Sequence, residues 1–118
     1  MSVHEGPHAI SRRNNVPLSP GMLVTNEPGY YEPGKFGIRI ENVLLVKEST
    51  IKINNKGKML TTETLSLAPI DKTLIDLKLL THDERRWLNK YHKKVEEKIS
   101  PLIEPSVRSW LKNACSPI

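Results

Sequence analysis

The sequence predicts an α+β fold in which antiparallel β hairpins are followed by two C-terminal helices. Three observations support this class. Short β-prone apolar runs alternate with proline and glycine turns over the first 70 residues, a helix-capping pattern follows, and apolar residues then recur at helical spacing. The length of 118 residues predicts one modest globular unit.

The first half of the chain holds the predicted strands. Residues 1–20 combine prolines, asparagines and histidines without periodicity, which indicates an irregular segment or loop. Residues 21–26 are a short β-prone apolar run, and residues 36–46 form a longer one that begins with apolar and charged residues in alternation. We expect these runs to form an antiparallel hairpin, with the proline- and glycine-rich segment 27–35 as its elaborated loop.

A second set of strands is expected before the helical region. Residues 54–57 have the sequence Asn-Asn-Lys-Gly, which is typical of a tight turn. A β-prone run at 50–53 precedes this turn, and a further strand is expected at 62–70. The first 70 residues are therefore predicted to be mainly β.

The helical region begins with a capping box. Thr81 and Glu84 have the spacing at which the threonine hydroxyl accepts from the glutamate amide while the glutamate reaches back to the threonine amide. We therefore expect a helix from residue 82 to residue 100, ended or bent by Pro101. Its apolar stripe follows three- and four-residue steps and comprises Leu88, Tyr91, Val95 and Ile99.

A second, shorter helix is expected after Pro105. Ser106 is its predicted N-cap, because a serine hydroxyl can accept from the amides of the first turn. The predicted apolar face of this helix comprises Val107, Trp110, Leu111 and Ala114.

Composition restricts the classes of function. No stretch approaches the roughly 18 to 20 apolar residues of a membrane helix, and the N-terminus lacks a signal-peptide pattern, so we expect a cytoplasmic protein without a membrane partner. Cys115 is the only cysteine, which excludes an intramolecular disulfide and fits a reducing compartment. The net charge of +5 is spread along the chain, so we expect solvated faces and no nucleic-acid partner. A basic nucleic-acid-binding module is the alternative, and it predicts binding that weakens as salt rises.

Two carboxylates flank the predicted hairpin loop. Glu27 closes the first strand and Glu41 lies on the second, so the hairpin could bring both to one site, as hard divalent cations require. Arg39 shares a strand face with Glu41 and could orient or neutralise a carboxylate there. Because a glutamate beside a strand is most often simply solvated, this spacing is by itself a weak indication of a metal site.

Three strings carry a more specific signal. In chain order they are VHEGP at residues 3–7, GMLVTNEPGYY at residues 21–31 and FGIRIENV at residues 36–43. At these separations they closely resemble the C-terminal part of Xaa-Pro aminopeptidases (aminopeptidase P), which are pita-bread metallopeptidases. A weaker resemblance at residues 65–70 and 87–92 extends to the C-terminal extension of the cytosolic eukaryotic type.

The resemblance implies roles for five residues. The glutamate matching Glu27 is a catalytic metal ligand that can act as general base toward the attacking water, and the one matching Glu41 is a second metal ligand. The histidine matching His4 binds substrate near the scissile bond and takes part in catalysis. Arg39 and Tyr31 match residues that keep the metal carboxylates oriented. The implied cofactors are two divalent ions, usually Mn²⁺, and the implied substrates are peptides with proline in second position.

The family site needs more ligands than these strings supply. Two aspartates and one histidine come from segments upstream of VHEGP, so we expect the isolated chain to be inactive. The implied fold is a partial pita-bread fold, with residues 1–80 in the catalytic domain and residues 81–118 as a helical extension. Because upstream strands and helices would complete the sheet, we expect self-association or a homodimer. A truncated, non-catalytic interaction module is the alternative.

Overall fold

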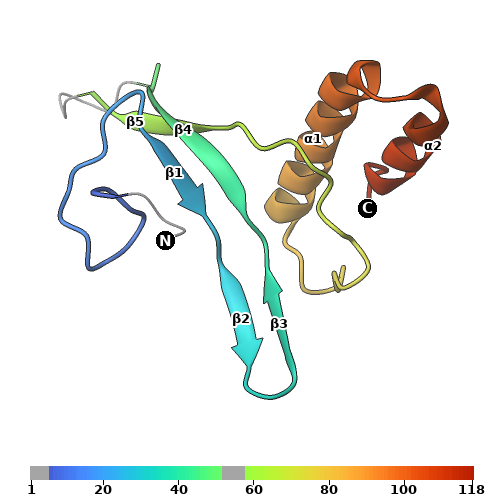
Figure 1. Cartoon of the computed structure of the whole chain (residues 1–118), viewed down its shortest axis with the longest axis horizontal. Helices are drawn as coiled ribbons and strands as arrows, with labels where there is room; N and C mark the ends of the chain where they lie inside the picture. The colour runs from blue at the N-terminus through green and yellow to red at the C-terminus, as the bar shows by residue number, and fades with distance from the viewer. Residues whose placement is uncertain (1–5, 52–57) are drawn as a thin grey trace. The chain divides into compact units, whose positions relative to one another are not determined.

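The computed structural model describes residues 6–51 and 58–118 (Figure 1). These residues form two compact units, residues 1–66 and residues 67–118, where the chain length predicted one. The α+β class is confirmed, because antiparallel strands make up the first unit and helices dominate the second. The turn predicted at 54–57 lies outside the described residues. The predicted family boundary after residue 80 stays a prediction.

The first unit contains a three-stranded antiparallel sheet in the order β1–β4–β5. The strands are β1 (Leu23–Asn26), β4 (Asn42–Glu48) and β5 (Leu60–Thr64). Val24 on β1 and Val46 on β4 are buried, and both are β-branched residues that favour a pleated, half-buried surface. The sheet therefore has a small apolar face, and β4 at its centre carries most of the pairing.

One further strand lies where a loop was predicted. β2 (Gly29–Glu32) pairs with β3 (Phe36–Arg39) in an antiparallel ribbon, so the expectation of a loop over 27–35 was wrong for residues 29–32. Residues 33–35 form the turn between the two strands. There Gly34 has φ +71°, a value that favours glycine, and Lys35 N–H donates to Glu32 O at 3.0 Å.

The single strand predicted at 36–46 is interrupted at Ile40 and Glu41. Ile40 N–H donates to Pro28 O at 3.2 Å, but Pro28 has no N–H with which to return the hydrogen bond. The ladder loses one rung here, and this divides the hairpin into the sheet on one side and the β2–β3 ribbon on the other.

The predicted capping box is present at the start of α1 (His82–Ile99). Glu84 N–H donates to Thr81 Oγ1 at 3.2 Å, and Thr81 N–H donates to Glu84 Oε2 at 2.8 Å. The helix ends at Ile99, and a 3₁₀ turn at Ser100–Leu102 contains Pro101, as the sequence predicted.

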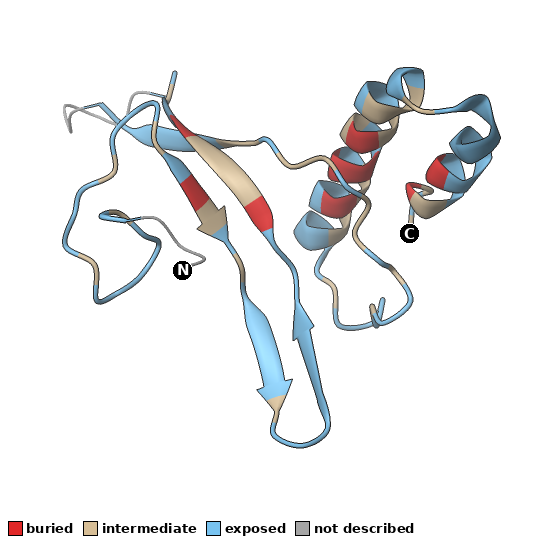
Figure 2. Ribbon diagram, viewed as in Figure 1, coloured by how far each residue is buried: buried red, intermediate tan, exposed pale blue. Residues whose placement is uncertain are grey.

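The apolar stripe of α1 forms the core of the second unit (Figure 2). Leu88, Tyr91 and Val95 are buried there together with Leu111 and Cys115. Isoleucines and a leucine from the rest of the unit pack around this cluster: Leu67, Ile70, Ile75, Ile99, Ile103 and Ile118.

The second helix differs from its prediction in two respects. α2 (Pro105–Ala114) has Glu104 rather than Ser106 at its N-cap, because proline favours the first helical position. The predicted apolar face is also only partly buried. Its members range in exposed fraction from 2% for Leu111 to 41% for Val107 and 61% for Trp110.

The strand predicted at 62–70 ends at Thr64. Farther along, side chains of α1, and not a neighbouring strand, form hydrogen bonds with the backbone. Tyr91 Oη donates to Ala68 O at 2.8 Å, and Ile70 N–H donates to His92 Nε2 at 3.0 Å. His92 is fully buried. Burial, followed by the charge of Lys72, lowers the pKa of His92 below its usual value, so the neutral ring that accepts the Ile70 proton is favoured.

We expect the 118-residue chain to lose stability as the pH falls through the His92 titration. The pKa of His92 is lower in the folded chain than the value of roughly 6.5 expected in the unfolded chain. Its stabilising contribution is therefore complete above that value and is lost as the pH falls below it. The loss should be on the order of 1 kcal/mol, the net value of a hydrogen bond. Urea unfolding between about pH 7.5 and about pH 5.5, followed by circular dichroism, measures it.

Two variants test the assignment to this histidine. His92→Gln keeps a hydrogen-bond acceptor but has no proton to gain, so it should flatten the pH dependence. His82→Gln changes an exposed histidine at the start of α1 and should leave the dependence intact. If both variants retain the wild-type pH profile, His92 is not its source.

Candidate metal site

The two predicted carboxylates lie opposite each other across the hairpin. β1 pairs Asn26 with Asn42, and β2 and β3 continue in the same register beyond the interruption. Glu27 and Glu41, the next residues on the two strands, are therefore cross-strand partners. The Pro28–Ile40 pair beyond them is hydrogen-bonded, so Glu27 and Glu41 form a non-hydrogen-bonded pair, in which Cβ atoms are about 4.5–5.5 Å apart.

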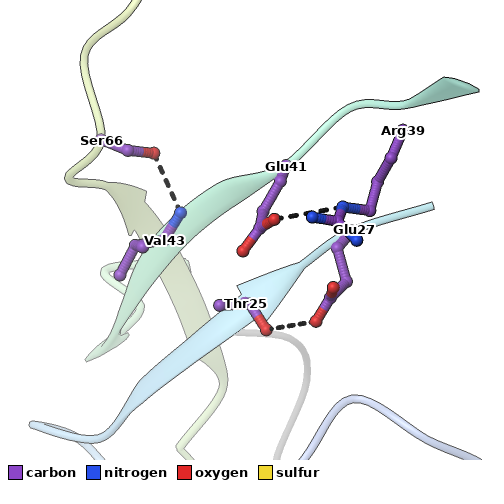
Figure 3. Close-up of polar contacts among 6 residues, drawn as sticks. All are labelled: Thr25, Glu27, Arg39, Glu41, Val43 and Ser66. Atoms are coloured by element: carbon purple, nitrogen blue, oxygen red, sulfur yellow. Dashed lines mark hydrogen bonds and ion pairs between the residues drawn. The ribbon is translucent and has the colours of Figure 1, made fainter. Parts of the chain in front are cut away.

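Each carboxylate has a partner on the same face of the hairpin (Figure 3). Thr25 Oγ1 donates to Glu27 Oε1 at 2.9 Å. Arg39 Nε lies 3.3 Å from Glu41 Oε2 in an ion pair. Figure 3 shows the Glu27 carboxylate turned toward Thr25, with the Arg39 guanidinium on its other side next to Glu41.

Like charges placed directly opposite each other destabilise a strand pair. Arg39 offsets this repulsion only in part, because one cation faces two anions. A divalent cation with oxygen ligands would offset it further, and Glu27 and Glu41 supply carboxylate oxygens of the kind such ions bind. The donor set therefore fits a share of a divalent metal site. Among residues 6–51 and 58–118, no group of three or more His, Cys, Asp or Glu could hold a metal ion.

Tyr31 lies across two glycines on the same face. It is the cross-strand partner of Gly37, and a Cβ atom on Gly37 would lie 2.8 Å from Tyr31 Cδ1. A Cβ atom on Gly29 would lie 2.7 Å from Tyr31 Oη. The absence of side chains at both positions lets the ring lie close to the backbone. A hydrogen bond to the Tyr31 hydroxyl and then the charge of Glu41 raise the pKa of Arg39, so the guanidinium stays charged.

The backbone next to Glu41 is held by Ser66, two residues beyond the end of β5. Val43 N–H donates to Ser66 Oγ at 2.9 Å, and Ser66 Oγ donates to Asn42 Oδ1 at 3.1 Å. Asn42 is buried, with 8% of its surface exposed. Figure 3 shows the contact between Val43 and Ser66 close to Glu41. The network fixes the point where β4 begins, and with it the backbone position of Glu41.

A cavity of about 570 Å³ adjoins Glu27. Its walls come from β1, from β4 and from the segment before β1, where His8 Nε2 lies 2.7 Å from Leu23 O. The apolar lining includes Ile10, Leu23, Val24, Pro28 and Val43, and the polar members are His8, Thr25, Asn26 and Glu27. The cavity thus combines one carboxylate, Glu27, with several apolar side chains.

The structure brings four of the five predicted site residues to one face of the hairpin: Tyr31, Glu27, Glu41 and Arg39. His4 lies outside the described residues, and the roles of all five stay predictions. The sequence reasoning missed Thr25, Gly29 and Gly37. The signal for Thr25 was a hydroxyl two residues before Glu27, a spacing that places both side chains on one strand face. The signal for Gly29 and Gly37 was the presence of glycine within β-prone segments, which often marks a close approach to the backbone.

Comparison with known proteins agrees with the resemblance. Residues 1–48 match metallopeptidase family M24, and residues 58–118 match the C-terminal region of peptidase M24. The whole chain aligns with 20% of the length of Xaa-Pro aminopeptidase 1 of Dictyostelium discoideum, at 47% sequence identity. It also aligns with 18% of the length of aminopeptidase P1 of Lotus japonicus, at 48% identity. The chain thus spans about a fifth of the length of these relatives.

A solved structure shows the same fold. The whole chain matches 20% of the X-prolyl aminopeptidase of Caenorhabditis elegans, with a TM-score of 0.87 and 35% sequence identity. That protein is described as a cytosolic enzyme with a di-nuclear active site. The antiparallel strands and two helices of this chain therefore correspond to part of a pita-bread aminopeptidase. No helix of the described residues has the length and apolar character needed to cross a membrane.

Proposed function

Because this chain belongs to metallopeptidase family M24, we propose that it forms the C-terminal part of a Xaa-Pro aminopeptidase with a dinuclear metal centre. The observation that carries the proposal is the cross-strand pair of Glu27 and Glu41. A bound divalent cation would offset the repulsion between these two negative charges. These residues supply two carboxylate ligands. The remaining ligands come from the rest of the enzyme, since the chain spans about a fifth of its relatives.

The substrates are peptides with proline in second position. Divalent ions at such a centre polarise a carbonyl oxygen and lower the pKa of water, and Mn²⁺ suits carboxylate ligands. Glu27 takes a proton from the attacking water as general base. Arg39 and Tyr31 keep the Glu41 carboxylate oriented, and His4 contacts the peptide next to the bond that breaks. The products are the free N-terminal residue and a peptide that begins with proline.

We propose a cytosolic enzyme that forms homodimers or otherwise self-associates. The C. elegans relative, described as cytosolic, supports the location. An apolar surface on the ribbon face opposite the carboxylates supports the association, and also supports the second candidate, a non-catalytic interaction module. Its residues are 41–59% exposed: Tyr30, Phe36, Ile38 and Ile40.

A chimeric enzyme tests the proposed function. This chain would replace the matching C-terminal fifth of the Dictyostelium enzyme, to which it is 47% identical. We expect the chimera, loaded with Mn²⁺, to cleave Xaa-Pro peptides at a rate comparable to the parent enzyme. We expect the isolated 118 residues to release no product, because two carboxylates alone leave a divalent ion mostly to water. A folded, metal-loaded chimera that cleaves no such peptide would favour the interaction module.

A further inference from the structure

We propose that Thr25 is a positioning residue that holds the Glu27 carboxylate in the orientation needed for metal binding and proton transfer. The proposal rests on the function proposed above for Glu27. The two residues are separated by one position on an extended strand, so their side chains leave the same face. Thr25 Oγ1 donates to Glu27 Oε1 at 2.9 Å, a charge-assisted bond and so stronger than a neutral one.

The hydrogen bond between Thr25 and Glu27 lies at the wall of the cavity beside Glu27. Thr25 and Glu27 are both half-buried, and both line the cavity of about 570 Å³. Water competes less for a hydrogen bond in such surroundings than on an open surface. The threonine hydroxyl therefore acts on the carboxylate where a substrate would reach it.

Arg39 is the competing partner of this carboxylate. Its guanidinium forms an ion pair with Glu41, and, after the hydrogen bond to Tyr31, the charge of Glu27 is among the causes that raise the pKa of Arg39. A Glu27 carboxylate that swung toward Arg39 would have its lone pairs occupied by a guanidinium, and these lone pairs are the ones a metal ion requires. The hydrogen bond from Thr25 holds the carboxylate on the other side. Thr25 thus binds one carboxylate oxygen of Glu27 independently of the arginine.

Threonine suits this task better than serine. A β-branched side chain has restricted χ1 rotamers, and Thr25 sits within β1, paired with Val43 on β4. The hydroxyl is therefore held at a fixed place before any ligand arrives. Serine offers the same donor on a more mobile side chain, and valine has the same shape without the donor.

The test uses the full-length enzyme that carries these residues, with Mn²⁺ as the metal. Titration of free Mn²⁺ by electron paramagnetic resonance measures affinity without any substrate. We expect Thr25→Val to weaken Mn²⁺ binding by about 10–100-fold and to lower kcat, with little change in KM for a Xaa-Pro peptide. Thr25→Ser should restore most of the affinity. Thr61→Val, at an exposed threonine on β5, is the matched control and should bind Mn²⁺ as the wild type does.

Several outcomes would overturn the role of Thr25. Wild-type Mn²⁺ affinity in Thr25→Val is one, and a lowered melting temperature with unchanged affinity is another, since that result indicates a purely structural side chain. A Thr25→Ser variant as weak as Thr25→Val would also count against it. If the wild type binds Mn²⁺ but cleaves no Xaa-Pro peptide, the proposed function fails, whereas weakened binding in Thr25→Val still supports this inference.

Discussion

Glu27→Gln is expected to lower kcat for Xaa-Pro hydrolysis in the full-length enzyme by about 10²–10⁴-fold, the usual contribution of a general base. The amide of glutamine matches the shape of the carboxylate and can still accept the hydrogen bond from Thr25. It carries no negative charge, so it binds a divalent ion weakly and cannot take up a proton from water at neutral pH. Steady-state kinetics together with metal analysis by mass spectrometry separate these two losses.

Glu41→Gln is expected to cause a comparable loss for a different reason. Glu41 is paired with Arg39, and its substitution leaves the guanidinium charge facing Glu27 alone. The variant should therefore lose metal content first and activity as a consequence. The matched control is Glu48→Gln, which removes an exposed carboxylate at the far end of β4, paired with Lys58 at 2.9 Å. Near-normal rates in both site variants, with full metal content, would rule out this assignment.

Gly37→Ala is expected to reduce activity by about 10–100-fold, the usual range for a residue that supports metal ligands. The added Cβ atom would lie 2.8 Å from Tyr31 Cδ1, a distance that real Cβ contacts do not show, so the ring has to move. Its hydroxyl then leaves Arg39, and the guanidinium loses the group that holds it beside Glu41. Measurement of kcat and of Mn²⁺ affinity in the full-length enzyme checks this prediction.

A double-mutant comparison distinguishes this route from a general loss of folding. Tyr31→Phe removes only the hydroxyl. If Gly37 acts through that hydroxyl, Gly37→Ala should reduce activity far less in the Tyr31→Phe background than in the wild type. Fully additive losses would mean that the glycine serves the fold and not the site. Gly34→Asn, in the turn of the same ribbon where φ is +71°, is a control, because asparagine tolerates this conformation.

The helical half of the fold could be predicted closely, because its signals are local. Each end of α1 is specified by residues within one helical turn of it. The capping box of Thr81 and Glu84 specifies the start, and Pro101 specifies the end. The stripe of α1 then specified which side chains are buried. Val107 and Trp110 on α2 were exceptions, since a short helix buries only the residues that its neighbours reach, and no local pattern tells which these are.

The strands could be predicted only in outline, because their partners are distant in sequence. The apolar run at 36–46 predicted one strand, but Pro28 on the opposite strand removes a hydrogen bond and interrupts it. The strand predicted to reach residue 70 stops at Thr64, because the side chains of Tyr91 and His92 bind the backbone beyond it. In both cases the deciding group comes from another segment of the chain.

The sequence by itself determined the family resemblance, the two carboxylates and the order of the elements, because these depend on residue types and short spacings. The tertiary structure decided that Glu27 faces Glu41, that Thr25 and Arg39 hold them to opposite sides, and that two glycines make room for Tyr31. The physical reason is register: a slip of one residue would turn every side chain of a strand to the other face, and register is set by hydrogen bonds between strands.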